Sequence, residues 1–185
     1  GYGRALSENF SVGGHLKRAY QYLGNNVVPV SDSSNTVENN VANAIAVDFG
    51  TIYITDWHGF TFGMSVRNFS EEVEYGYDSF QLPLTFRIGG SIDALSFLPS
   101  LSEKQSLRMA LEALHPRSYP ERLNLGLEYS FMDLGYVRLG YFLNYDERNL
   151  TYGAGIKLGP LKIDYALTPF GVFDSVSRIS VGIAR

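Results

Sequence analysis

Apolar and polar side chains alternate residue by residue in segments of about ten residues throughout the chain. In RLNLGLEYSF, Arg122–Phe131, every second residue is Leu, Tyr or Phe, and the residues between them are Arg, Asn, Gly, Glu and Ser. Because successive side chains of a strand point to opposite faces, this pattern predicts a strand with one apolar and one polar face. A soluble sandwich would bury the leucines, whereas a membrane barrel would turn them to lipid and keep Arg122 and Glu128 in its lumen.

The repeated alternation predicts an all-β, antiparallel fold. We expect about ten strands, at 9–22, 43–55, 59–69, 82–94, 106–115, 122–132, 136–146, 150–159, 161–170 and 175–185. Most exceed the five or six residues that are usual in soluble proteins and match the nine to eleven that a tilted strand needs to cross a bilayer. Residues 95–114 contain good helix formers, but the period of two favours a strand in their second half.

The composition excludes several classes of protein. No run of 18 apolar residues is present, which excludes a transmembrane helix. The formal net charge of −4 offers no basic surface for nucleic acid, and the absence of cysteine excludes disulfides and thiolate metal sites. A strand end at Tyr2–Arg4 followed by a turn at Ser7–Asn9 suggests that the chain starts within a hairpin. We therefore expect a single barrel domain over 1–185 whose N-terminal strands are missing.

The polar faces carry charges of both signs and most of the strand glycines. Glycine is depleted on solvated strands, so this combination favours a crowded lumen, and the opposite, almost purely aliphatic and aromatic faces favour lipid contact. The predicted lumen charges are Arg87, Arg108, Glu112, Arg122, Glu128, Arg138, Lys157 and Asp164, with Asp48, Arg67, Asp93 and Lys162 on the same polar faces. They could gate a solute or pair with one another to hold the barrel, and the sequence leaves both open.

Motifs for catalysis or cofactor binding are weak. GAGIKLG, Gly153–Gly159, lies inside an alternating strand and opens no helix, unlike a dinucleotide-binding turn. His15, His58 and His115 are far apart, and a hydrolase built on His115 and a serine has no supporting motif. The acidic segment 71–78 lacks the ligand pattern of an EF-hand loop. We therefore predict no enzyme activity, cofactor or metal, and an interfacial anchor at Trp57 and His58.

Long and short connections alternate along the predicted strands. The long polar loop 24–43 and the acidic loop 70–79 contrast with tight turns such as DWHG, 56–59. Bacterial barrels have long outer loops and short periplasmic turns, which places the C-terminus in the periplasm. Loops on a rigid scaffold usually carry binding, so an extracellular rim is the predicted contact surface, with the candidate residues Thr36, Glu38, Glu71, Glu72 and Glu74.

Several segments together resemble the PorV/PorQ family of outer-membrane proteins. They are GYGRALSENFSVGGHLK, AIAVDFGTIY, HPRSYPERLNLGLEYSF, RLGYFLNYDERNLTYGAGIKLG and LKIDYALTPFGVFDSVSRISVGI. The resemblance implies a FadL-like barrel of about 14 strands in the bacterial outer membrane, of which roughly the first four strands and the plug would be missing here. Arg185 stands where such barrels commonly finish in an aromatic residue.

The resemblance also implies a function and partners. PorV-like members are not enzymes and serve type IX secretion, receiving secreted cargo and passing it to the attachment machinery. The expected partners are outer-membrane lipid, other secretion-system proteins and cargo, with no nucleic acid. No short cargo motif carries over to particular residues of this chain. Two alternatives stay open: a FadL-like channel for hydrophobic small molecules, and a soluble β-sandwich binding module.

Overall fold

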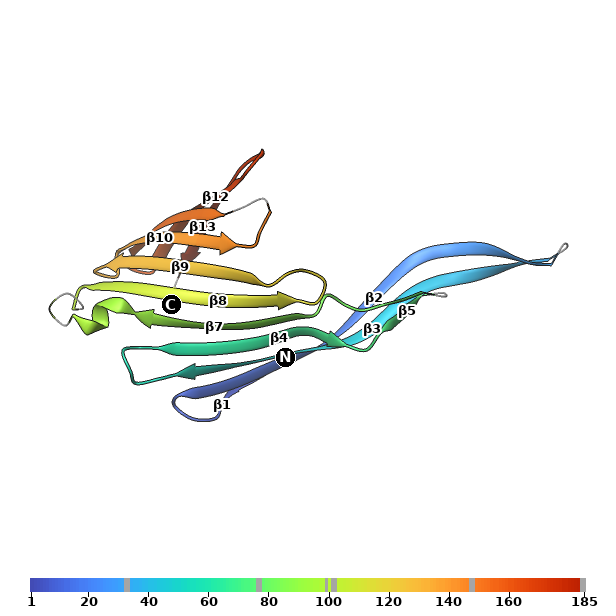
Figure 1. The fold of residues 1–185 in the computed structure, drawn as a ribbon, viewed down its shortest axis with the longest axis horizontal. Coiled ribbons are helices and arrows are strands. Elements are labelled where there is room, and N and C mark those ends of the chain that lie inside the picture. Colours follow the sequence, from blue (N-terminus) through green and yellow to red (C-terminus); the bar gives the residue numbers. More distant parts are fainter. Residues whose placement is uncertain (32–33, 76–77, 99, 101–102, 147–148, 184–185) are drawn as a thin grey trace.

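The computed structural model describes residues 1–31, 34–75, 78–98, 100, 103–146 and 149–183. Eleven strands form one antiparallel sheet in chain order, each paired with the strands before and after it (Figure 1). They are β1 (Tyr2–Ala5), β2 (Phe10–Ser31), β3 (Ser34–Ile54), β4 (Thr61–Ser70), β7 (Thr85–Asp93), β8 (Gln105–Pro116), β9 (Arg122–Phe131), β10 (Gly135–Leu143), β11 (Leu150–Leu158), β12 (Leu161–Phe170) and β13 (Phe173–Ile183).

Two smaller elements lie in the connections. A short hairpin of β5 (Val73–Tyr75) and β6 (Asp78–Phe80) interrupts the link between β4 and β7, and a 3-10 turn, η1 (Ala94–Phe97), precedes β8. The all-β antiparallel prediction is confirmed, as is the strand in the second half of 95–114. Within the described residues β1 and β13 are the two edges of an open sheet, so barrel closure stays a prediction. No described helix is long and apolar enough to cross a membrane.

The predicted loop at 24–43 is wrong. β2 and β3 instead stay paired from Gly24–Asn40 to Ser31–Ser34 and run past the sheet as a twisted two-stranded ribbon (Figure 1). This segment is rich in Asn and Ser on both faces, so it carries no hydrophobic alternation to reveal its strands. Thr36 and Glu38, predicted loop residues, therefore have strand backbones in β3.

A buried core is nearly absent from the described part of the chain. The buried side chains are Ala42, Ala46, Val73, Leu114 and Ser130. The accessible surface is 13444 Å², whereas a compact monomer of this mass exposes about 8,900 Å². Apart from the β5–β6 hairpin, the described strands form a single layer without a second sheet against which the leucines could pack.

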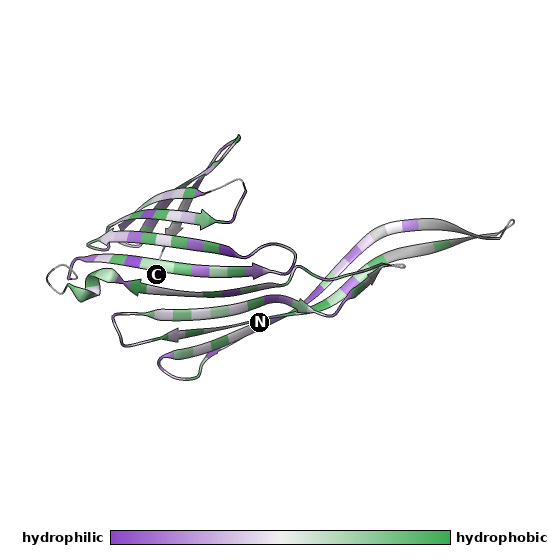
Figure 2. Ribbon diagram, in the orientation of Figure 1, coloured by the Kyte–Doolittle hydropathy of each residue, from purple (hydrophilic) through white to green (hydrophobic). Residues whose placement is uncertain are grey.

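Exposure alternates along β9, β10 and β11, and it shows which face of these strands is more sheltered. In β9, Leu123, Leu125 and Leu127 are 38%, 43% and 40% exposed, whereas Arg122 and Glu128 are half-buried. Alternating hydrophilic and hydrophobic bands along β8–β10 mark the same pattern in Figure 2. We call the sheltered, charged side of the sheet the inner face and the apolar, exposed side the outer face. The apolar residues of the alternating sequence pattern therefore lie on the outer face.

Candidate functional site on the inner face

Strand register brings the predicted polar residues onto one face. Directly paired residues of neighbouring strands share a face, and the pairs Arg108–Glu128 and Glu128–Arg138 form a row of alternating charge across β8, β9 and β10. Asp93 extends this row on β7 by pairing with Arg108. By the same registers Arg87, Glu112, Arg122, Lys157 and Asp164 also lie on the inner face.

Arg138 is the centre of an ion-pair cluster in the C-terminal half of this face. Its Nε donates to Glu128 Oε2 at 2.5 Å, and its Nη1 donates to Asp164 Oδ1 at 2.6 Å. The three side chains are about 30% exposed. One guanidinium therefore joins β9, β10 and β12 through two charge-assisted hydrogen bonds, which are the strong kind.

Glycines of β11 make this connection possible. The strand lies between β10 and β12, and a Cβ added to Gly155 would stand only 2.5 Å from Asp164 Oδ1. At Gly153 an added Cβ would stand 3.2 Å from the Cβ of Arg138. The glycine pattern of GAGIKLG thus clears a path for the ion pair across β11.

Aromatic and basic side chains complete the cluster. Arg138 Cζ and Lys162 Nζ lie 5.4 and 5.5 Å from the ring centroid of Tyr136, and Lys162 Nζ lies 3.6 Å from Asp164 Oδ2. Two cations thus face two carboxylates with an aromatic ring beside them, so the group is close to electrically balanced. Its chemistry is that of a clamp that holds neighbouring strands in register.

The N-terminal half of the inner face holds two adjoining grooves instead. The larger, of about 630 Å³, runs over a floor that includes Gly13, Gly50, Gly63 and Gly89, with Glu112 at its side. The smaller, of about 380 Å³, is lined by residues that include His15, Asp48, Ser65 and Arg67. Both grooves share Gly13, Gly50, Ser65 and Arg87.

Arginines in this half have incomplete sets of partners. Arg87 Nη1 lies 3.7 Å from Glu112 Oε1, and its buried Nε has no hydrogen-bond partner among the described residues. Arg67 has no carboxylate within 4.0 Å in the described part of the chain. Asp48, which lines the same groove, is already paired with Lys17 Nζ at 2.7 Å and accepts from the Asn68 backbone N–H at 2.8 Å.

Three further predicted residues lie on the inner face outside these groups. Arg122 stacks between Tyr119 and Tyr145, with ring centroids 5.1 and 4.6 Å from its Cζ, and its buried Nε has no hydrogen-bond partner within the described chain. Arg108 has no ion pair within 4.0 Å among the described residues, and Lys157 is half-buried opposite Lys162. The predicted inner charges therefore differ widely in how they are paired.

The ribbon projects from one end of the sheet, which we call the rim, and the acidic hairpin of β5 and β6 lies at the same end. Val73 is 3% exposed and shares a cleft of about 190 Å³ with Ala42, Ala44 and Phe80, which anchors β5 at the base of the ribbon. The predicted contact residues Glu71 and Glu72 are exposed before this hairpin, and Glu74 lies within β5.

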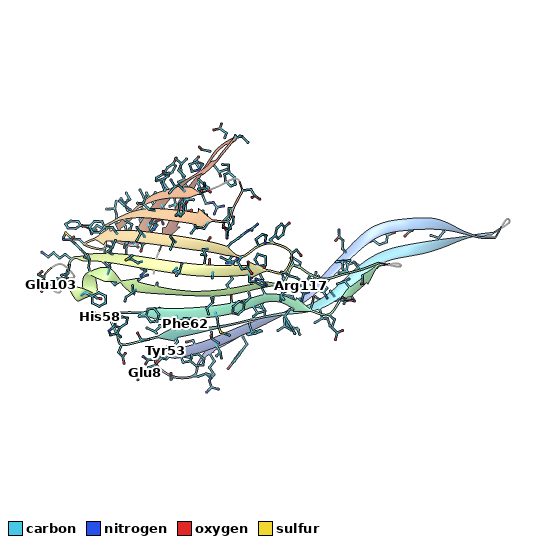
Figure 3. All side chains as sticks on the ribbon, viewed as in Figure 1. Glu8, Tyr53, His58, Phe62, Glu103 and Arg117 are labelled. Carbon is cyan, nitrogen blue, oxygen red and sulfur yellow. The ribbon has the colours of Figure 1, made fainter. Side chains whose placement is uncertain are left out.

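Neighbouring contacts tie this rim together. Glu72 Oε1 accepts from Gln81 Nε2 at 2.9 Å, and Gln81 also accepts from Arg117. Arg117 lies at the opposite end of the sheet from Glu8, His58 and Glu103 (Figure 3). The ribbon and the hairpin thus form one anchored projection at a single end of the sheet.

The three histidines have separate environments. His58 stacks on Phe97 at 3.9 Å and contacts Ser96 Oγ at 3.1 Å, beside Trp57. His115 Nδ1 lies 3.1 Å from Glu121 Oε1. Among the described residues, no three His, Cys, Asp or Glu side chains gather where they could hold a metal ion.

The arrangement of the site was only partly visible in the sequence. The alternation of residues along each strand placed the charged residues on one of its sides. The grooves, however, depend on which glycines stand next to one another across strands. The recurrence of glycine at charged-face positions was the available signal for both the groove floor and the path across β11. No family model and no curated protein matches this chain.

Proposed function

We propose that this chain forms the wall of a PorV-like outer-membrane β-barrel that binds secreted cargo or partner proteins through its ribbon-bearing rim. The observation that carries the proposal is the orientation of β9, β10 and β11, whose apolar side chains are exposed on one side and whose charged side chains are more sheltered on the other. In water this orientation forgoes about 25 cal/mol of stabilising free energy for each Å² of apolar surface left exposed. Contact with lipid would remove that cost. Further strands would close the open edges, as spanning structures require.

Support for protein binding comes from the shape of the rim. β2 and β3 project beyond the sheet, and the buried Val73 fixes the acidic hairpin against the base of this ribbon. An anchored projection loses less entropy when it binds than a free loop does. With this rim outside the cell, β13 runs toward the periplasm. The proposal includes no catalytic activity, and the resemblance to the PorV/PorQ family supplies the link to type IX secretion.

The membrane location can be tested with neighbouring substitutions on the two faces. Leu111 pairs with Leu125 on the outer face, and Ala110, next to it, pairs with Gly126 on the inner face. We expect Leu111→Arg to lower the yield of folded protein in outer-membrane fractions, because arginine on the lipid face costs about 2–4 kcal/mol near the midplane. Ala110→Arg should fractionate as the wild type does. The reverse order, or recovery of the wild type in the soluble fraction, would refute the membrane proposal.

The role of the ribbon can be tested by shortening it. A variant in which a two-residue turn joins Tyr22 to Val41 removes the projecting part, since these two residues are paired. We expect this variant to reach the outer membrane but to lose the secretion-system or cargo proteins that co-purify with the wild type in detergent, measured by quantitative mass spectrometry. Equal recovery of those proteins with and without the ribbon would contradict binding through this rim.

A FadL-like channel for hydrophobic small molecules is the second candidate. The observation in its favour is the groove of about 630 Å³ on the inner face, whose lining includes Ile52 and Ala110. Purification of a barrel without protein partners but with bound apolar solute would favour it over the first proposal.

A further inference from the structure

We propose that the inner face binds an anionic small molecule, with one carboxylate or phosphate group held between Arg67 and Arg87 and a narrow body lying over the glycine floor. This site is formed by residues of the sheet and not by the ribbon or the acidic hairpin, and it does not depend on the identity of any protein partner.

The two arginines are placed to share one anion. Arg67 on β4 pairs with Thr85, and Arg87 follows two residues later on β7. They are therefore diagonal neighbours on the same face, with backbones about 7–8 Å apart. Guanidinium groups at that separation can converge on a single oxyanion, and their planar donors suit carboxylate and phosphate oxygens.

Neither arginine has a close ion pair in the described part of the chain. Arg87 has only the 3.7 Å contact with Glu112 and a buried Nε without a partner in the described chain. Glu112 is in turn held by Asn124 Nδ2 at 2.9 Å. Asp48, the other nearby carboxylate, is occupied by Lys17 and the Asn68 amide. Because a buried donor without an acceptor costs free energy, a ligand oxyanion that supplies the acceptor is favoured.

The grooves give the rest of the ligand its place. They meet at Arg87 and Ser65, and together extend along Gly13, Gly50, Gly63 and Gly89. Glycines leave the strand backbones uncovered, so a narrow body can lie flat against the sheet. The hydroxyls of Ser11 and Ser91 line the larger groove and can donate to further ligand oxygens.

Binding can be measured by titration calorimetry of the full-length protein in a non-ionic detergent at low salt. The probes are hexyl phosphate, hexanoate, inorganic phosphate and hexanol. We expect hexyl phosphate or hexanoate to bind and hexanol not to bind, since the charge is the main recognition element. The stronger of the two charged probes identifies the preferred oxyanion, and inorganic phosphate shows how much binding the body adds.

Variants locate the site. Arg67→Gln and Arg87→Gln should each weaken binding of the charged probe about tenfold or more, the usual effect of losing a charged hydrogen-bond donor. Arg108→Gln is the matched control, since Arg108 is on the inner face but lines neither groove, and it should bind as the wild type does. If a Gln variant fails to fold, Arg67→Lys or Arg87→Lys takes its place and should weaken binding by a smaller factor.

The glycine floor has its own variant. A Cβ at Gly63 meets nothing closer than Thr51 O at 3.5 Å, so Gly63→Leu fills the groove without a backbone clash. It should reduce the affinity for hexyl phosphate to that for inorganic phosphate. The proposal is overturned if hexanol binds as well as hexyl phosphate, if the Arg67 and Arg87 variants bind like the wild type, or if the Arg108 variant loses binding equally.

Discussion

The two halves of the inner face use the same residue types, arginine and glycine, for different purposes. In the C-terminal half, Arg138 is held by carboxylates from β9 and β12, so its charge is neutralised within the fold. In the N-terminal half, Arg87 has one long contact, and Arg67 has no ion pair within the described chain. Whether an arginine on a polar strand face is structural or available to bind a ligand thus depends on how many carboxylates the strand register places beside it.

Glycines differ between the halves in the same way. Gly153 and Gly155 leave room that the chain's own ion pair fills, whereas Gly63 leaves room that no described side chain fills. The glycine pattern is therefore no guide to function until the neighbours across the strands are known. Substitutions in each half test this contrast.

Loss of Arg138 should have the largest effect. Arg138→Met leaves Glu128 and Asp164 half-buried without their shared cation, and the loss of these charged hydrogen bonds should lower the unfolding free energy by about 2–3 kcal/mol. Urea unfolding followed by the fluorescence of Trp57, the single tryptophan, measures it. Arg108→Met, which breaks no ion pair within the described chain, is the control and should change the free energy by less than about 0.5 kcal/mol. Equal losses in both variants would remove the distinction between the paired and unpaired arginines.

Closing the path across β11 should have the next largest effect. Gly155→Ala puts a Cβ 2.5 Å from Asp164 Oδ1 and forces the ion pair with Arg138 apart, at a cost of about 1–2 kcal/mol. At Gly126, on the inner face of β9, an added Cβ meets only the Ala110 Cβ at 3.8 Å. Gly126→Ala should therefore be neutral or slightly stabilising, because alanine restricts the unfolded chain more than glycine does. The same unfolding titration compares them, and a tolerated Gly155→Ala would contradict the role given to this glycine.

Arg87 should matter little for stability. Its contact with Glu112 is long, and both side chains are more than a third exposed, so Arg87→Gln should cost no more than about 0.5 kcal/mol. A loss as large as that of Arg138→Met would show that Arg87 belongs to the framework of the sheet. The expected combination, unchanged unfolding with weakened anion binding, would separate the two halves by function.

The sequence predicted best those elements in which apolar and polar residues alternate. The strand expected at 161–170 is β12, Leu161–Phe170, and that expected at 122–132 differs from β9 by one residue. The ribbon was missed because neither face of 24–43 is consistently apolar, so its strand pairing has no hydrophobic signature. Parity placed the charges on a face, but the contact of Arg138 with Asp164 spans two strand spacings and follows only from the register of β10, β11 and β12.

The smallest expected effect concerns the exposed rim. A hydrogen bond from its own backbone amide, with His115 nearby, lowers the pKa of Glu121 below its usual value. A carboxyl group whose pKa is lowered by folding stabilises the folded state above its ordinary pKa, and this stabilisation is lost as the pH falls through the lowered value. The thermal midpoint of the wild type should therefore exceed that of Glu121→Gln slightly at pH 6, and the difference should disappear in more acidic buffer. A difference in thermal midpoint that instead grows on acidification would have the wrong sign. If Glu121→Gln lowered the unfolding free energy in urea as much as Arg138→Met does, exposed and sheltered pairs would stabilise this sheet equally.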